Sequence, residues 1–469
     1  MHLPTLFQKI GWIATLGCML LLSALASAGQ AERCAVAPLF PVPETFSQTL
    51  YVGPQGSAQA EGTRQDPFAT LEQAAERAAP GTRIVLLDGE HQTGQFLTRL
   101  HGTADAPILI TGEEGGEGAF FRGGQEALHL IEPAYVVLRN FTVEQNTSNG
   151  INIDDGGDYD TPAHHLILEN LRVRNIQASG NIDGMKLSGL DHFHIRNCLV
   201  ENPGAGGSAI DMVGCHDGVI WQNEIRDCAN TGIQAKGGTA RITIYDNCFC
   251  DAGLRAINLG GSTGLAYFRP MDAPYEAANI TVLANVFEAV QTPVAFVGSI
   301  NSLFANNTVL YPQKWIARIL QETTGERFAA SGNNVFANNL ILIDQQVGTL
   351  VNIGPNTAPE TFRFIHNAII RPNDPLGSLN LPGETNGNQV EASPLFLFLE
   401  ESADQHRLDP QSPLIEAGIP LAQAIEGMSI QVSNLGDAAQ FCWQNPPAIG
   451  AYSQAATSRV DNWQEVGVE

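Results

Sequence analysis

Short apolar segments alternate with turns through the middle of the chain, and one segment of each repeat alternates strictly between apolar and other residues. Positions one and three of this segment are apolar in all seven copies, and position two is polar in six of them. The copies are 151–154, 185–188, 210–213, 233–236, 257–260, 294–297 and 317–320. A period of two is typical of a strand with one buried face. The pattern predicts stacked coils, each with three short strands.

An asparagine precedes an apolar strand in each coil of this expected stack. The intervals run from 22 to 38 residues, and the series is Asn140, Asn170, Asn197, Asn223, Asn247, Asn285, Asn307, Asn339 and Asn367. Stacked coils lie about 4.8 Å apart, so each amide can hydrogen-bond to the amides above and below it. We expect these nine residues in one register at a corner of a right-handed parallel β-helix.

A short amphipathic helix is expected before the repeats. Thr70-Leu-Glu-Gln73 has the form of a capping box, apolar residues recur at helical spacing from Leu71 to Ala78, and Pro80 ends the segment. Such a helix would cover the open N-terminal end of the stack. The predicted fold class is all-β: a single-stranded right-handed parallel β-helix with three short strands per coil and an N-terminal capping helix.

The first 28 residues have the form of a signal peptide. An apolar run from Ile10 to Leu25 is followed by Ala26-Ser27-Ala28, a small-x-small cleavage site. The run is short for a membrane span, although a retained N-terminal anchor is the alternative. We expect a signal peptide at 1–28, a linker at 29–48, the β-helix at 49–390 and a closing segment with a tail at 391–469. The protein would be secreted or periplasmic, with no integral membrane span after signal removal, and monomeric.

Composition narrows the choice of ligand. The chain has 24 basic and 49 acidic side chains and a net charge of −25, which argues against a nucleic-acid partner because phosphate neutralisation needs a basic face. Four residues are lysines, and two of them, Lys186 and Lys236, fall on the alternating face.

Export would leave seven cysteines in a compartment that permits disulfides. Their spacings resemble no zinc site. Two pairs are expected to form disulfides: Cys34 with Cys442, which would join the ends, and Cys228 with Cys250 on neighbouring coils.

The segments 51–56, 62–70 and 80–84 resemble the N-terminal signature of the pectate-lyase-like superfamily, exported β-helix proteins that act on polysaccharides. The resemblance covers about residues 50 to 390. One coil, Ile233-Gln-Ala-Lys236-Gly-Gly followed by residues 242–249, is similar to the lysine-bearing coil of the alginate lyase and chondroitinase B family. That resemblance implies that Lys236 is a base assisted by an arginine of the next coil.

Two features depart from that family. Its arginine lies on the strand, where this chain has Leu259, and Arg255 precedes the expected strand. Asn230 and Gly232 replace the acidic calcium ligands that the family has just before the lysine. Ca²⁺ is nevertheless a possible cofactor, because oxygen-rich clusters suit it, and the candidate ligands are Asp154 and Asp183. The alternative is that these acids are solvated.

Elimination from a uronic-acid polymer needs a cation beside the substrate carboxylate, a base for the C5 proton and an acid for the leaving oxygen. The catalytic candidates are Lys236 as base, Arg255 to neutralise the carboxylate and Lys186 in support. A lysine that only pairs with a loop carboxylate is the alternative. Candidates for substrate binding lie on the alternating face, in the long insertion, or just after the last alternating segment: Asn152, Asp211, Gln234, Asn258, Tyr267, Arg269, Arg318 and Glu322.

The sequence therefore predicts an exported lyase that cleaves an acidic, uronic-acid-containing polysaccharide by β-elimination. A C5-epimerase or a glycoside hydrolase could use the same groove, although the paired aspartates of inverting hydrolases are here a single Asp211. A non-catalytic glycan-binding envelope protein is the competing class, because fold does not fix function.

Overall fold

The computed structural model describes residues 34, 36–177, 179–371, 376–390, 408, 411–430, 435–437, 442–443 and 445–452. The expected signal peptide and much of the expected closing segment and tail lie outside these residues. In the part of the chain that is described, no helix has both the length and the apolar character needed to cross a membrane.

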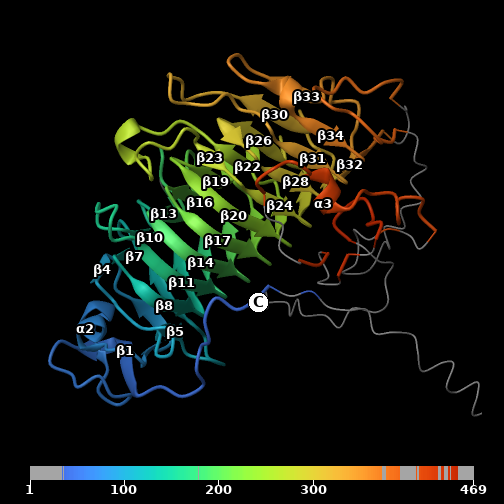
Figure 1. Cartoon of the computed structure of the whole chain (residues 1–469). Coiled ribbons are helices and arrows are strands. Elements are labelled where there is room, and N and C mark those ends of the chain that lie inside the picture. Colours follow the sequence, from blue (N-terminus) through green and yellow to red (C-terminus); the bar gives the residue numbers. More distant parts are fainter. Residues whose placement is uncertain are drawn as a thin grey trace, which may run out of the picture.

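Three parallel sheets run the length of the molecule, and successive strands of the chain pass from sheet to sheet (Figure 1). Sheet I contains β1 (Gln48–Ser57), β2 (Thr82–Leu86), β5 (Ile108–Gly112), β8 (Ala134–Arg139), β11 (Ala163–Glu169), β14 (Leu190–Arg196), β17 (His216–Trp221), β20 (Thr239–Tyr245), β24 (Thr281–Leu283), β28 (Leu303–Ala305), β31 (Val335–Ala337) and β34 (Arg363–Ile365), with the short β23 (Ala277–Ala278) and β27 (Ser299–Ile300) beside them.

Sheet II carries the site described below. Its strands are β4 (Gln95–Thr98), β7 (Leu128–Ile131), β10 (Ile151–Asp154), β13 (Met185–Ser188), β16 (Ser208–Val213), β19 (Thr231–Lys236), β22 (Arg255–Gly260), β26 (Val294–Val297), β30 (Ala317–Leu320) and β33 (Val351–Ile353). All seven predicted alternating segments are strands of this sheet. β16, β19 and β22 begin two residues earlier than predicted, so Arg255 is the first residue of β22 instead of preceding it.

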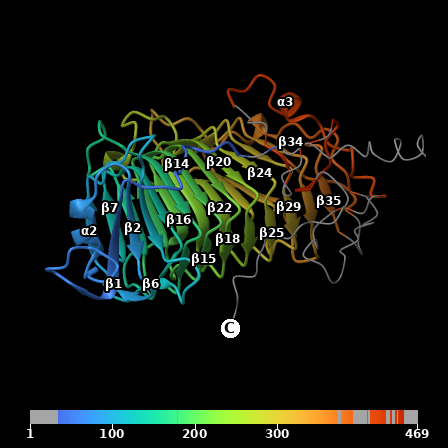
Figure 2. The ribbon, with the colours of Figure 1, turned by 90° about the horizontal axis from the view of Figure 1, so that it is seen from below.

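Sheet III forms the third wall of the coils (Figure 2). Its strands are β3 (Gly89–His91), β6 (Ala119–Arg122), β9 (Phe141–Glu144), β12 (Arg172–Arg174), β15 (Leu199–Glu201), β18 (Glu224–Arg226), β21 (Cys248–Cys250), β25 (Val286–Glu288), β29 (Thr308–Leu310), β32 (Leu340–Leu342) and β35 (Ala368–Ile370). The elements outside the sheets are the helix α2 (Leu71–Arg77), two 3₁₀ turns, η1 (Leu265–Tyr267) and η2 (Pro359–Thr361), and a short helix α3 (Leu421–Ala424).

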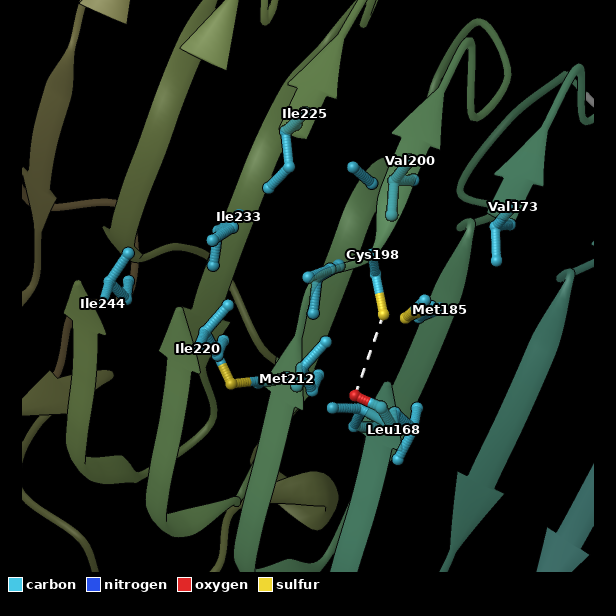
Figure 3. Packing of buried hydrophobic residues seen from close by; sticks show 14 of the residues in the cluster. Leu168, Val173, Met185, Cys198, Val200, Met212, Ile220, Ile225, Ile233 and Ile244 are labelled. Carbon is cyan, nitrogen blue, oxygen red and sulfur yellow. Dashed lines mark hydrogen bonds between the residues drawn. The ribbon is translucent and has the colours of Figure 1, made fainter. Parts of the chain in front are cut away.

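The core is the interior of the coils, where stacked aliphatic side chains from the three sheets meet (Figure 3). Met185, Met212 and Ile233 of sheet II face Ile220 of sheet I and Val200 of sheet III, and all five are fully buried. Each large aliphatic side chain buried in this way contributes about 1.5–3 kcal/mol. The strict alternation fixes the register, because a slip by one residue would turn every apolar side chain of the strand outward.

The predicted asparagine series is confirmed from Asn223 to Asn367. Its earlier members each lie one residue before the position that the later asparagines occupy in their coils. A buried ladder joins the amides of Asn223, Asn247, Asn285, Asn307, Asn339, Asn367 and Asn388, each amide nitrogen donating to the amide oxygen of the next coil. Asn140, Asn170 and Asn197 instead occupy the preceding corner position, where φ is +52° to +60°. Asparagine tolerates this left-handed conformation, so the two positions look alike in sequence.

The capping helix is confirmed as α2 (Leu71–Arg77). Thr70 and Gln73 form the predicted capping box, and Leu71 and Ala74 are buried against the first coil. Glu72 Oε1 accepts from the backbone nitrogen of Phe96 at 2.7 Å, which satisfies part of the edge of β4.

One of the two expected disulfides is present. Cys34 and Cys442 are bonded, so the two ends of the described chain are joined as predicted. The prediction of a Cys228–Cys250 bond is wrong. Phe249 of β21 points into the core, so Cys250 beside it faces away, whereas Cys228 is buried.

Candidate functional site

A single row of side chains crosses the outer face of sheet II at position two of the predicted alternation. The strand register places these residues opposite one another in the order Phe96, His129, Asn152, Lys186, Asp211, Gln234, Asn258, Ala295, Arg318 and Asn352. We call this series the outer row. It brings together six of the predicted site residues, and Figure 1 shows the strands that carry them lying side by side from β4 to β33.

Lys186, Lys236, Asp211 and Asp183 form a compact cluster near the middle of the outer row. The carboxylate of Asp211 accepts from Lys186 and lies 3.3 Å from Lys236 Nζ through its other oxygen. Asp183 lies 3.6 Å from Lys186 Nζ and also accepts from the backbone nitrogen of Ser208 at 2.7 Å. Asp211 therefore holds both lysines in place from beneath.

The cluster changes the proton affinity of its members. Burial first, and then the neighbouring charge of Asp211, raise the pKa of Asp183 to about 6, although the two lysines act in the opposite direction. Burial alone would lower the pKa of Lys186, but the adjacent carboxylates of Asp211 and Asp183 outweigh it and raise that pKa. Both carboxylates are about 1% exposed, whereas the lysines are 19% and 11% exposed. The face that a ligand meets is thus the ammonium side of the cluster.

Beside this cluster lies a hollow of 410 Å³. We call this hollow the cationic groove. Amide and hydroxyl side chains make up much of its lining, including Gln234 and Asn258 of the outer row. Among the described residues that line it, Glu322 is the one acid. Four are cationic: Lys236, Arg255, Lys314 and Arg318. The described lining of the groove is therefore positively charged, although the whole chain has a net charge of −25.

The arginines of the cationic groove are held by short polar contacts. Arg255 donates to Asn258 Oδ1 at 3.2 Å and to Glu322 Oε1 at 2.9 Å. Arg318 donates to Asn352 Oδ1 at 3.1 Å, and its guanidinium lies 4.7 Å from the centre of the Trp315 ring. Burial and the nearby charge of Arg255 lower the pKa of Arg318, although a guanidinium stays protonated at neutral pH.

Lys314 contacts the same indole. Its Nζ lies 4.3 Å from the Trp315 ring centre. The indole therefore keeps two cations at the groove wall through cation–π contacts. Three of the four lysines of the chain consequently lie in or beside the site.

The long insertion between β22 and β23 projects from the stack beside sheet II (Figure 1), and Ser262 near its start lines the cationic groove. Phe268 is its buried anchor, whereas Tyr267 is 67% exposed. Tyr159 donates to the backbone oxygen of Ala266 at 2.5 Å, which ties the insertion to an earlier coil. Arg269 points away from the groove lining, because both of its terminal nitrogens donate to Asp191, at 2.7 and 2.6 Å.

Glu276 is fully buried and accepts hydrogen bonds from three segments next to the cationic groove. Its carboxylate accepts from the backbone nitrogen of Gly237 at 2.8 Å, from the nitrogen and hydroxyl of Thr263 at 2.9 and 2.7 Å, and from the hydroxyl of Thr323. These residues follow β19, β22 and β30 respectively. One carboxylate thus fixes the segment after Lys236 against two walls of the cationic groove.

Several of these groups were not found from the sequence. Lys314 and Trp315 lie outside the alternating segment, and Glu276 lies in the insertion. The scarcity of lysine was the available signal for Lys314. His129, which continues the outer row, lay before the first strand that the alternation identified.

The candidate metal ligands fall into two separate clusters. Asp154 pairs with His129 at 2.7 Å, and Asp183 pairs with Lys186. Within the described ranges, no group of three or more histidine, cysteine, aspartate or glutamate side chains is arranged to hold a metal ion. Ammonium groups beside Asp183 do not suit a Ca²⁺ site, which needs six to eight oxygen ligands. A Ca²⁺ cofactor stays a prediction.

Comparison with known proteins agrees with this architecture. The family described as "Right handed beta helix region" matches residues 117–269 and 161–310. "Uncharacterized protein YwoF" of Bacillus subtilis (strain 168) is 29% identical over 215 residues, which cover 41% of this chain and 44% of that protein. The chain thus aligns with less than half of that relative's length.

Two crystal structures are also similar. Pectate lyase Pel9A matches with a TM-score of 0.52 at 14% identity, over 88% of this chain and 97% of that chain. The GH136 lacto-N-biosidase from Eubacterium ramulus matches with a TM-score of 0.48 at 13% identity, over 73% of this chain and 68% of that chain. Together with the three parallel sheets, the family match and the first of these structures show that the chain is a right-handed parallel β-helix with the pectate-lyase-like fold.

Proposed function

We propose that the protein acts on an acidic polysaccharide bound along the outer face of sheet II, and that it cleaves the polymer by β-elimination at a uronic-acid residue. The cationic groove carries this proposal: four cations and one acid line it in a strongly acidic protein. Amide side chains along the outer row suit sugar hydroxyls, and guanidinium groups suit carboxylates. The fold supports the same class, since it is shared with a pectate lyase.

In the proposed reaction, Arg255 and Arg318 neutralise the uronate carboxylate, which makes the C5 proton more acidic. Lys236 in its amine form takes that proton as the bond between C4 and the leaving oxygen breaks and the C4–C5 double bond forms. The leaving oxygen takes a proton from the ammonium of Lys186, which lies on the other side of Asp211.

The shared carboxylate supports Lys236 as the base. Asp211 is almost fully buried and pairs with both lysines, so Lys186 continues to compensate its charge when Lys236 is neutral. A buried carboxylate with a single ammonium partner would resist the loss of that partner's charge more strongly.

A C5-epimerase remains the second candidate, because it would begin with the same proton transfer and needs the same neutralised carboxylate. Hydrolysis is less well supported. It requires carboxyl groups that reach the scissile bond and a water molecule, whereas Asp183 and Asp211 lie beneath the lysines and are about 1% exposed.

Ultraviolet absorbance of the unsaturated product tests the proposal on alginate, pectate and chondroitin, with calcium or with a chelator. We expect absorbance to rise on at least one polymer with the wild-type protein. Lys236→Arg is the matched variant, because arginine keeps the positive charge but cannot lose its proton. It should bind the polymer and fail to cleave it. Equal cleavage by wild type and Lys236→Arg would exclude Lys236 as the base.

A further inference from the structure

The outer row continues beyond the lysine cluster towards the capping helix, and its chemistry changes there. Phe96 and Arg318 stand eight strand steps apart in the register, or ~38 Å at ~4.8 Å per step. The Arg318 end carries the cations of the cationic groove. The Phe96 end carries an aromatic ring, a histidine and two carboxylates, and we call it the aromatic end.

Phe96 offers a free apolar face at this end of the row. Its side chain is 54% exposed, in contrast to the buried phenylalanines of the core. Its ring centre lies 5.3 Å from that of His129, the next residue of the row. An exposed ring held in place on a strand provides a flat apolar surface of the kind that stacks on the C–H face of a sugar.

The polar side chains beside Phe96 hold one another in place through ion pairs and hydrogen bonds. His129 lies between two carboxylates, with Nε2 2.7 Å from Asp154 Oδ2 and Nδ1 3.4 Å from Glu126 Oε2. Bonds to these carboxylates, Asp154 first and Glu126 second, raise the pKa of His129 to about 9, so the imidazole is charged at neutral pH. Glu126 also accepts from Asn149 at 3.3 Å and from Asn152 at 3.4 Å.

The charge of this group decides which sugar it suits. Two carboxylates and one imidazolium leave the aromatic end with an excess of negative charge, which repels a uronate. The carboxylates of Glu126 and Asp154, which are 18% and 24% exposed, can still accept hydrogen bonds from sugar hydroxyls. The aromatic end therefore favours an uncharged sugar, while the cationic groove favours a charged one.

We propose that the substrate is a heteropolysaccharide in which uronic acids are joined to uncharged sugars, with an uncharged residue bound at Phe96, His129 and Glu126. This inference rests on the proposed function, since it names the substrate class of the same binding face. It assigns a specificity role to three residues that lie apart from the lysine cluster. A polymer made of uronate alone would place carboxylates against Glu126 and Asp154.

The test measures binding of two polymers by titration calorimetry with the full-length Lys236→Arg protein, which avoids turnover. Polygalacturonate carries a carboxylate on every residue, and hyaluronan alternates a uronate with an uncharged N-acetylated sugar. We expect tighter binding of hyaluronan. Phe96→Ala should weaken that binding by about three- to tenfold and leave polygalacturonate binding unchanged. Phe96→Tyr should restore it, and Glu126→Gln should strengthen polygalacturonate binding.

Tyr311→Ala is the matched control, because Tyr311 is an exposed aromatic residue (49%) that directly follows a strand of sheet III. It should change neither affinity. Equal effects of Phe96→Ala on both polymers, or no effect on either, would overturn the inference. The proposed function would still stand in that case if Arg318→Ala weakens binding. Failure of the protein to bind either polymer would overturn both the inference and the proposed function.

Discussion

Replacement of Asp211 by asparagine probes the electrostatics of the site most sharply, because this carboxylate holds both lysines. Asp211→Asn keeps the size of the side chain and removes its charge. Lys186 and Lys236 are then left with Asp183 as the nearest carboxylate, 3.6 Å from Lys186. Removal of one partner from a buried ion pair costs 3–5 kcal/mol. Because the lysines keep 11–19% exposure and Asp183 remains, we expect a loss of about 3 kcal/mol at pH 7.

The pH dependence of this loss follows from the sign of the Lys186 shift. The folded-state pKa of Lys186 lies above that of free lysine, with Asp211 as the main cause of the increase. Its contribution is therefore complete below about pH 10.4 and is lost as the pH rises through the folded-state pKa. The difference between wild type and Asp211→Asn should be full at pH 7 and should shrink above about pH 10.

Urea unfolding followed by circular dichroism measures the difference. Asp217→Asn is the matched control, because Asp217 pairs with Arg241 at an exposed corner, 2.7 Å away, and such surface pairs contribute about 0–1 kcal/mol. If Asp211→Asn destabilised the protein no more than Asp217→Asn does, the description of a buried, charge-coupled cluster would be refuted.

Three further predictions concern the ladder, His165 of β11 and the groove walls. Asn307→Ala removes an amide that donates to Asn339 and accepts from Asn285, so urea unfolding should show a loss of about 3 kcal/mol; a loss below 1 kcal/mol would contradict the ladder. Burial and neighbouring histidines lower the pKa of His165 to about 4, so its contribution is full above about pH 6.5 and falls as the pH drops towards 4. Thermal unfolding at pH 7 and pH 5 should show a smaller difference in His165→Phe than in wild type; an equal difference would refute this. Glu276→Gln removes the charge that anchors both walls of the groove, so KM should rise several-fold while the fold is kept; an unchanged KM would exclude a positioning role.

The fold could be read from the sequence because its repeat leaves one physical solution. Apolar residues at every second position must point inward, and three such strands per coil close around them. The pattern located seven strands of sheet II, although three of them begin two residues earlier than predicted. The capping box at Thr70 followed from its own motif. The corner asparagines did not, because the left-handed corner and the buried ladder both favour asparagine. In the structure, backbone φ, burial and hydrogen-bond partners distinguish Asn170 from Asn223.

The site could be predicted only where it lies on a strand. Lys186, Asp211, Gln234 and Arg318 share the outer row because the alternation places them there. The period says nothing about how a loop folds back, so the role of Glu276 in joining three loops became visible only in the structure. The same limit explains why the groups that hold the cations, such as Trp315, escaped the sequence analysis.

The account depends most on proton removal at C5 of a uronate by Lys236. Proton magnetic resonance of a bound acidic polymer in D₂O measures this step directly, and it does so for both elimination and epimerisation. The account predicts that the C5 proton signal of the polymer disappears with wild-type protein and persists with Lys236→Arg. A polymer that binds in an Arg318-dependent way while keeping every C5 proton would contradict the account and leave hydrolysis or binding without turnover.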